Sequence, residues 1–424
     1  MRIFLDSIGC RLNQSEIEKI SAQFRLAGHQ IVATPTEADL VVVNTCAVTV
    51  EAASDSRQKI RQAHRAGSGQ IVVTGCWATF DPAGAGTLPG VTRVVPNSDK
   101  NSLVANSLGF SGASVSTGIS ARQALPGVHQ RTRAFIKVQD GCDNHCTFCL
   151  TRLVRGQSIS TGLDEILTDI QAAILGGVRE IVLTGVQLGA WGKDLPSAKK
   201  LSDLVKIILK ETTVDRLRLS SVEPWSLDPD FYSVFADHRV CRHLHLPLQS
   251  GSGATLKRMA RQITPEAYAR TVSDLRSAVP DIALTTDILV GFPGETDQEF
   301  QDTLAFIREM KFTGGHVFTY SPRPGTAAVK LPGVVPPKVR KERNAVVREV
   351  LADLSERYWR QQVNTVTEVL WETAREDMPG SWTCEGLTGT YIRVTAKTPK
   401  NLWNNISQVR LTSLTQGGMI GEVL

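Results

Sequence analysis

The chain contains the run Gly141-Cys142-Asp143-Asn144-His145-Cys146-Thr147-Phe148-Cys149, in which three cysteines follow the spacing CxxxCxxC. This spacing is typical of an iron-sulfur cluster in which three thiolates bind three irons and the fourth iron stays open. A closed structural zinc site usually needs four ligands in two pairs, and no second pair at zinc-like spacing accompanies the triplet. A disulfide would need an oxidising compartment, and residues 1–6 do not begin a charged-then-apolar signal segment. We therefore predict that Cys142, Cys146 and Cys149 bind a cluster.

The cysteine run lies in a region where strand-like and helix-like patterns alternate, residues 133–323. Strand-like runs occupy residues 135–139, 180–184, 216–220, 243–247, 284–290 and 315–320. Six such βα units fit an open, partial parallel barrel, and the cysteine run follows the first of its strands. Active sites of such barrels lie at the carboxyl-terminal rim of the strands, so we expect the cluster there.

A second, more dispersed cysteine triplet lies near the N-terminus. Cys10, Cys46 and Cys76 each follow a short apolar, β-branched run that is typical of a buried strand. Helical patterns near residues 13–26 and 50–66 separate these runs, which predicts a parallel sheet. The three cysteines would then meet at the carboxyl edge of the sheet, where such folds bind ligands. The alternative is three buried structural cysteines, and the equivalent positions of the three make it the weaker interpretation.

The two triplets together resemble the radical S-adenosylmethionine (SAM) methylthiotransferases, a family whose members contain two 4Fe-4S clusters. Four stretches match patterns of this family in the expected order: residues 141–146, 245–252, 286–296 and 320–326. The resemblance implies that the CxxxCxxC triplet holds the cluster that cleaves SAM to a 5′-deoxyadenosyl radical. It implies equally that the dispersed triplet holds an auxiliary cluster, and that SAM is both methyl donor and radical source. The chain departs from the family pattern after Cys149, where a proline and an aromatic are usual, but it keeps the step Arg155-Gly156.

The strand-end residues of the predicted barrel are candidates for contacts with SAM. Small and short polar residues there allow a ligand to approach the backbone closely. The expected cofactor-binding residues are Phe148, Thr184, Gly185, Glu223, Gln249 and Ser250. In the family pattern, Phe148 occupies an aromatic position whose ring lies near the adenine. An ordinary loop role is an equal alternative for each of these residues taken singly.

Changes in composition along the chain predict five segments. They are an N-terminal domain with the auxiliary cluster (1–100), a Ser-, Gly- and Ala-rich linker (101–130), the radical SAM domain (131–335), a charged helical connection (336–362) and a segment of short β-like runs (363–424). The predicted fold class is therefore α/β, with an N-terminal parallel sheet, a central partial (βα)6 barrel and a C-terminal small β-barrel. The β-like runs of the last segment are expected at residues 365–371, 387–394, 406–411 and 421–424.

The last segment resembles TRAM, a small β-barrel RNA-binding domain that most members of the family contain. Candidate RNA-binding residues are Arg393, Lys397, Lys400, Trp403 and Arg410, with Trp382 and Tyr391 as further stacking candidates. Cations would contact phosphates and aromatic rings would stack on bases. A barrel core with scattered surface charge explains the same residues about as well.

Composition agrees with a cytoplasmic enzyme that acts on a polyanion. The chain has 424 residues and 42% hydrophobic content, enough for two or three domains with a sizeable core. No apolar run is long enough to span a membrane. The net charge of +5 permits an RNA partner without requiring one. Eight cysteines without a secretion signal favour metal binding or catalysis, and Cys241 and Cys384, outside both triplets, are expected to be structural.

The resemblance indicates tRNA as partner and C2 of N6-threonylcarbamoyladenosine, next to the anticodon, as the site of methylthiolation. Arg323 lies where members that modify a ribosomal protein usually have acidic neighbours, and Thr49 lies where the isopentenyladenosine enzyme commonly has arginine. Residues 44–49 and 316–318 look most like the threonylcarbamoyladenosine branch. The alternatives are isopentenyladenosine in tRNA, a ribosomal protein, and a non-catalytic, metal-dependent RNA-binding protein. An electron donor and a sulfur source are further expected partners, and the sequence identifies neither.

Overall fold

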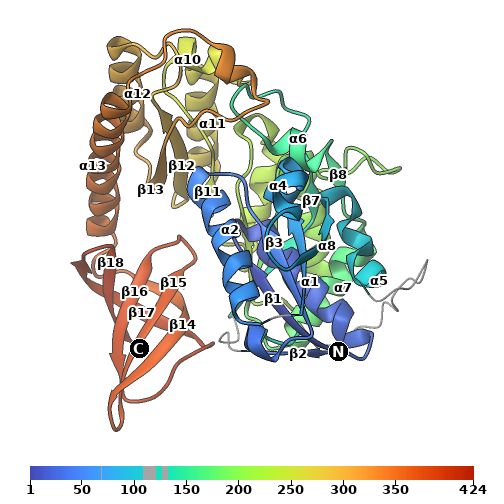
Figure 1. The fold of residues 1–424 in the computed structure, drawn as a ribbon. Helices are drawn as coiled ribbons and strands as arrows, with labels where there is room; N and C mark the ends of the chain where they lie inside the picture. Colours follow the sequence, from blue (N-terminus) through green and yellow to red (C-terminus); the bar gives the residue numbers. More distant parts are fainter. Residues whose placement is uncertain (68, 108–120, 127–131) are drawn as a thin grey trace.

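The computed structural model describes residues 1–67, 69–107, 121–126 and 132–424, which form an N-terminal sheet domain, a central barrel and a small C-terminal barrel (Figure 1). Most of the predicted linker, residues 108–120 and 127–130, lies outside the described residues. At its start, Leu103 and Val104 are buried against the N-terminal sheet. Among the described residues, no helix is long and apolar enough to cross a membrane.

The N-terminal domain contains the predicted parallel sheet, which has five strands in the order β2-β1-β3-β4-β5. Its strands are β1 (Arg2–Ser7), β2 (Gln30–Ile31), β3 (Leu40–Thr45), β4 (Gln70–Gly75) and β5 (Val91–Val95), and its helices are α1 (Arg11–Leu26), α2 (Val50–Arg65), α3 (Cys76–Phe80), α4 (Pro82–Gly86) and α5 (Leu103–Ser107). Successive residues of a strand point to opposite faces. Val41 and Val43 therefore pack on the face covered by Ile60 of α2, and Val42 packs on the face covered by Ile17 of α1.

The central domain is an arc of six parallel strands, which confirms the predicted partial barrel. The strands are β6 (Arg133–Lys137), β9 (Glu180–Thr184), β10 (Arg216–Leu219), β11 (His243–His245), β12 (Ala283–Val290) and β13 (Gly314–Thr319). They form two three-stranded sheets, β6-β9-β10 and β11-β12-β13, joined by a parallel bridge between Ser221 and His245. The helices are α6 (Thr151–Arg155), α7 (Leu163–Leu175), α8 (Leu201–Glu211), α9 (Pro229–Tyr232), α10 (Gly253–Arg258), α11 (Pro265–Ala278) and α12 (Asp297–Met310), and a small hairpin contains β7 (Gln139–Asp140) and β8 (Ile159–Ser160). One continuous apolar core lies between the strands and their helices.

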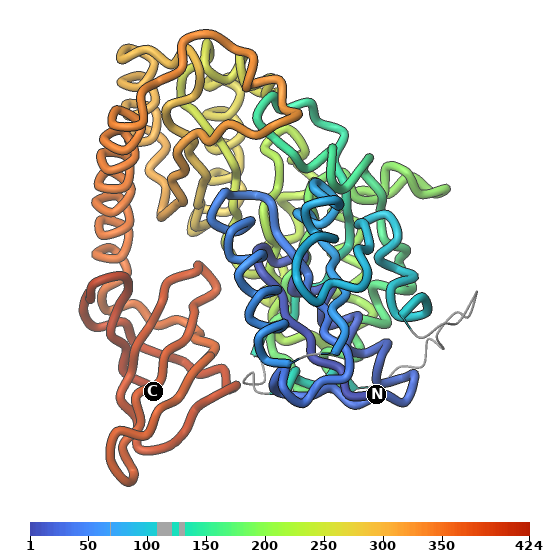
Figure 2. The backbone as a smooth tube through the Cα atoms, in the orientation of Figure 1, coloured from blue at the N-terminus to red at the C-terminus, as the bar shows by residue number. Residues whose placement is uncertain are grey.

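The C-terminal part begins with the long helix α13 (Pro337–Gln361), which runs along one side of the molecule from the central domain to the C-terminal barrel (Figure 2). The barrel is closed in the order β14-β15-β16-β18-β17, as predicted for a small β-barrel. Its strands are β14 (Val366–Met378), β15 (Ser381–Thr388), β16 (Arg393–Thr398), β17 (Ile406–Thr415) and β18 (Gly418–Val423). The single strand predicted at residues 387–394 is wrong, because the chain turns between β15 and β16 and Tyr391 has a φ of +69°.

The turn between β15 and β16 docks the C-terminal barrel onto the central domain. Arg218 donates hydrogen bonds to the carbonyl oxygens of Thr388 and Gly389, each at 3.0 Å. The ring of Tyr391 stacks on His243 with a centroid separation of 4.7 Å, and its hydroxyl lies 3.0 Å from Nη2 of Arg11 in α1. Tyr391, considered above as a base-stacking residue, is thus a contact among all three parts of the molecule.

Candidate active site

The dispersed cysteines lie at one edge of the N-terminal sheet, after neighbouring strands. Cys46 and Cys76 directly follow β3 and β4, and Cys10 follows β1 by three residues. Gly9, with a φ of +106°, lies so close that a Cβ on it would be 2.6 Å from Sγ of Cys46. Cys10 is exposed, whereas Cys46 and Cys76 are buried. The structure therefore brings this triplet to the edge of the sheet that the sequence indicates.

Buried thiols at this edge need a positive partner to ionise. The pKa of Cys46 is raised to about 11, mainly by burial and to a lesser extent by the neighbouring Cys10 and Cys76. Among the described residues, no three His, Cys, Asp or Glu side chains lie close enough together to grip one metal ion. A four-iron cluster binds each thiolate to a different iron and so accepts sulfurs that lie further apart. The donor set fits such a cluster.

The CxxxCxxC cysteines lie on the loop that joins β7 to α6, close to the rim of the central barrel. The loop is fixed at both ends: the amide of Cys142 donates to the carbonyl of Gly156 at 3.1 Å, and that of Thr147 donates to Met259 at 3.0 Å. Burial raises the pKa of Cys142 to about 11, with further contributions from Cys149, Glu223 and Cys146. Arg261 Nη1 lies 3.6 Å from Sγ of Cys146. These three thiols also gather in one place, beside a cation.

Two glutamines that the sequence analysis did not select as site residues join this loop to the end of β9. The fully buried Gln139 donates to the carbonyl of Gly141 at 2.8 Å and accepts from the amide of Gln187 at 2.7 Å. The side chain of Gln187 accepts from the amide of Asp143 at 3.1 Å. A polar residue at the end of a buried strand, next to the cysteine run, was the available signal. Gln139 also explains Gly185, because a Cβ there would lie 3.0 Å from its Oε1.

The other predicted SAM-binding residues lie around the same rim. Thr184 is buried at the end of β9. Glu223 accepts from the amide of Gly189 at 3.3 Å, and burial raises its pKa to about 7. Gln249 has a φ of +77°. The hydroxyl of Ser250 is used inside the protein, 3.0 Å from that of Thr303 on α12.

Phe148 packs within an aromatic cluster beside the cysteine loop. Its ring makes an edge-to-face contact with Phe292 at 6.3 Å, and Phe292 makes a similar contact with Tyr320 at 5.4 Å. Nucleotide binding by Phe148 and by the strand-end residues stays a prediction.

Two family models match the chain. The model described as the Radical SAM superfamily matches residues 136–307, and that described as Uncharacterized protein family UPF0004 matches residues 2–95. Among curated proteins, threonylcarbamoyladenosine tRNA methylthiotransferase MtaB of Bacillus subtilis (strain 168) is 35% identical over 96% of this chain and 92% of its own length. The chain belongs to the radical SAM methylthiotransferase family. The predicted enzyme class, with SAM and 4Fe-4S clusters as cofactors, is thereby confirmed.

Similar relatives of this methylthiotransferase include proteins of two different names. The MtaB protein of Thermotoga maritima is 39% identical over 87% of this chain and 86% of its own length. A tRNA-2-methylthio-N(6)-dimethylallyladenosine synthase of Caldicellulosiruptor saccharolyticus is 30% identical over 98% of this chain and 91% of its own. Among solved structures, the radical SAM methyltransferase TsrM of Kitasatospora setae has a TM-score of 0.60 at 15% identity, with 77% of this chain and 75% of TsrM covered. That likeness shows the shared fold.

The candidate RNA-binding residues of the methylthiotransferase are spread over the C-terminal barrel. Arg393 and Lys397 are exposed on β16, Lys400 is exposed after it, and Arg410 is exposed on β17. Trp403 is half-buried in the loop before β17. The four cations are available to a polyanion, and their role stays a prediction.

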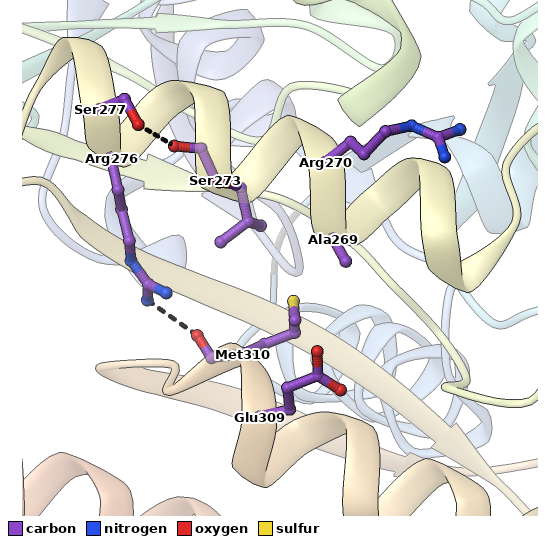
Figure 3. Close-up of a pocket in the computed structure, with 8 residues that line it drawn as sticks. Ala269, Arg270, Ser273, Arg276, Ser277, Glu309 and Met310 are labelled. Carbon is purple, nitrogen blue, oxygen red and sulfur yellow. Dashed lines mark hydrogen bonds between the residues drawn. The ribbon is translucent and has the colours of Figure 1, made fainter.

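A groove of about 580 Å3 lies between α11 and α12 of the methylthiotransferase, on the outer layer of the central barrel (Figure 3). Two of its polar side chains bond within the protein: Arg276 donates to the carbonyl of Met310 at 2.8 Å, and Ser277 donates to that of Ser273 at 2.9 Å. No cysteine lines it. The groove therefore does not belong to the candidate active site.

Proposed function

We propose that this methylthiotransferase adds a methylthio group to C2 of N6-threonylcarbamoyladenosine in tRNA. The proposal rests above all on the 35% identity to a protein named for this activity, which extends over 96% of the chain. Four more relatives with the same name match at 31% to 39% identity. The dimethylallyladenosine enzymes, at 30%, support isopentenyladenosine as the second candidate substrate.

In this proposal, Cys142, Cys146 and Cys149 bind the cluster that interacts with SAM, and the dispersed triplet binds the auxiliary cluster. When bound, the clusters and SAM supply the electron, the radical and the methyl group. The chain's own residues hold these groups in place and limit the access of water. Insertion of a methylthio group also requires sulfur and reducing equivalents from outside, so an electron donor and a sulfur source are further partners.

The protein's contribution at the SAM site is to fix a flexible loop. Gln139 and Gln187 hold the backbone of the cysteine loop to the end of β9. Arg261 donates to the carbonyl of Pro247 at 2.8 Å and so points its guanidinium toward Cys146 from a fixed position. A positive group near cluster sulfurs stabilises their negative charge. Burial raises the pKa of Glu223 to about 7, so this carboxyl on the same rim is only partly ionised at pH 7.

Mass spectrometry of tRNA nucleosides tests the proposal. The chain is expressed in a host that lacks its own methylthiotransferases, beside a Cys142→Ala/Cys146→Ala/Cys149→Ala variant. Cys384→Ala is the matched control, because Cys384 is a free cysteine buried in the C-terminal barrel, far in sequence from both triplets. We expect a methylthio increment on threonylcarbamoyladenosine with the wild type and the control, and none with the triple variant.

Each other result has a definite meaning. An increment on isopentenyladenosine alone would retain the reaction and change the substrate. A full increment with the triple alanine variant would refute the role of the CxxxCxxC cysteines. If tRNA gained no increment while the iron stayed bound, the ribosomal-protein alternative would replace the proposal.

A further inference from the structure

A buried arginine connects the two cysteine triplets. Arg155 is the last residue of α6, the helix that begins two residues after Cys149, and its side chain is 3% exposed. Its Nε lies 3.2 Å from Sγ of Cys76 in the N-terminal domain. The same guanidinium donates to Oδ1 of Asp140 at 2.9 Å, just before the cysteine loop. One side chain therefore contacts the auxiliary site and both flanks of the CxxxCxxC loop.

Asn13 extends this contact to the other two dispersed cysteines. Its Oδ1 accepts a hydrogen bond from Arg155 Nη2 at 2.8 Å. Its Nδ2 donates to the carbonyls of Ile8 at 2.7 Å and Thr45 at 3.0 Å, which lie in the segments leading to Cys10 and Cys46. Arg155 and Asn13 together therefore connect the ends of the three strands that lead to the dispersed cysteines.

The charges around Arg155 do not cancel. Glu16, 4% exposed, binds Arg155 at 2.9 Å, Lys100 at 2.6 Å and Lys137 at 3.1 Å. Asp140 binds Arg155 and Lys137. Three cations and two carboxylates leave one net positive charge in this buried network. Because charges interact strongly in a low-dielectric interior, that excess favours negative charge on nearby sulfur.

We propose that Arg155 is a positioning residue that sets the reduction potential of the auxiliary cluster and fixes that cluster against the CxxxCxxC loop. The inference rests on the proposed function, which makes Cys76 a cluster ligand. Hydrogen bonds to cluster sulfurs and nearby positive charge stabilise the more negative, reduced state and so raise the potential. Arg155 supplies both the hydrogen bond and the positive charge. Its guanidinium also binds Asn13, Glu16 and Asp140, and these contacts fix the direction of the N–H group that points to Cys76.

The test uses the Cys142→Ala/Cys146→Ala/Cys149→Ala variant, which retains the auxiliary site alone. Arg155→Lys is added, because lysine keeps the charge but cannot point a fixed N–H at Cys76 while also binding Asn13 and Glu16. The midpoint potential is measured by a redox titration followed by electron paramagnetic resonance. We expect the reduced form to be disfavoured about tenfold, a shift of about 59 mV to more negative potential for one electron.

Arg152→Lys is the matched control. Arg152 lies one turn earlier on α6 and points to His145 rather than to Cys76, so its replacement should leave the potential unchanged. Asp140→Asn is the second variant: it removes a negative charge from the network and should move the potential in the opposite direction. If the Arg155→Lys variant no longer binds iron, the potential of the Asp140→Asn variant tests the role of the charge network.

Iron retained at about four per chain, with potentials unmoved in both the Arg155→Lys and Asp140→Asn variants, would overturn the role of Arg155 and leave the proposed function intact. If the parent triple variant bound no iron, the assignment of the auxiliary ligands would be wrong, and the inference would be overturned with it.

Discussion

At the scale of single residues, Gly9 determines how closely two of the dispersed cysteines approach. Gly9→Ala would place a Cβ 2.5 Å from Cβ of Cys46 and 2.6 Å from its Sγ, a distance that forces one of the two loops to move. We expect the auxiliary cluster to be lost, so that iron falls from about eight to about four per chain after anaerobic reconstitution. Iron analysis measures this directly.

Gly28 provides the control for backbone strain. It also has a positive φ, +81°, but a Cβ there would meet nothing within 4 Å. Gly28→Ala therefore destabilises the fold by about 1–2 kcal/mol, because alanine disfavours a positive φ, but it creates no clash. Equal iron losses in the two variants would mean that strain, and not contact with Cys46, explains the effect.

The sequence predicted the six cysteines of the site but not the side chains that orient them. Cysteine spacing and strand ends are local signals. Arg155, Gln139 and Arg261 contact sulfur or loop backbone across 79, 2 and 115 positions of sequence, respectively. The contacts of the two arginines come from the packing of separate elements. The family step Arg155-Gly156 marked Arg155 without indicating what it contacts, and no local pattern marked Arg261. Gln139 could have been selected from the sequence, because it is a polar residue at the end of an apolar strand-like run and lies just before the cysteine run.

At the scale of elements, the docking turn of the C-terminal barrel depends on a neutral histidine. Burial holds the pKa of His243 well below its usual range, with Arg218, His245 and Arg11 acting in the same direction. The unfolded chain therefore binds a proton below about pH 6.5 that the folded protein rejects. Stability due to this group is complete above that pH and decreases as the pH falls, by up to about 1.4 kcal/mol per pH unit.

His243→Gln should make the decrease shallower, because glutamine does not titrate and can still bond to the hydroxyl of Thr285, as His243 does at 3.0 Å. The Tm is compared between about pH 7.5 and about pH 5.5. His238→Gln is the control, since the side chain of His238 is 90% exposed. Parallel Tm curves for wild type and His243→Gln would contradict the prediction.

The elements of the central barrel could be predicted closely, and those of the C-terminal barrel less so. A strand buried on both faces has a continuous apolar signal, as at residues 180–184, where prediction and structure coincide. The turn at residues 389–392 has no such clear signal in the sequence. Ile392 is apolar and buried and directly precedes β16, so the pattern indicates one continuous strand. The positive φ of Tyr391 is stabilised by its contacts with the central domain, which the local sequence does not contain.

At the scale of the whole molecule, the C-terminal barrel docks on the central domain, and the RNA contacts predicted for its exposed cations are a separate question. One face covers a buried cluster in which Glu180 binds Arg218 at 2.8 Å and Arg216 at 2.9 Å. Deleting residues 363–424 would expose that cluster and destabilise the central domain, so a loss of tRNA binding after deletion would not identify an RNA surface. Substitutions of exposed cations away from the docking turn test the predicted RNA contacts without this loss of stability.

Arg393→Gln/Lys397→Gln removes two exposed cations from β16 without touching the docking turn. If both contact tRNA phosphates, the slope of log K against log salt should become shallower by about 1.4 to 1.8, because each neutralised phosphate contributes about 0.7 to 0.9. Lys206→Gln/Lys210→Gln is the charge-matched control, on exposed positions of α8 in the central domain. Filter binding across a salt series measures both variants. An unchanged slope for the β16 variant would mean that Arg393 and Lys397 do not contact tRNA phosphates. The same change in the control would mean that the net charge of the protein, rather than this strand, accounts for its attraction to tRNA.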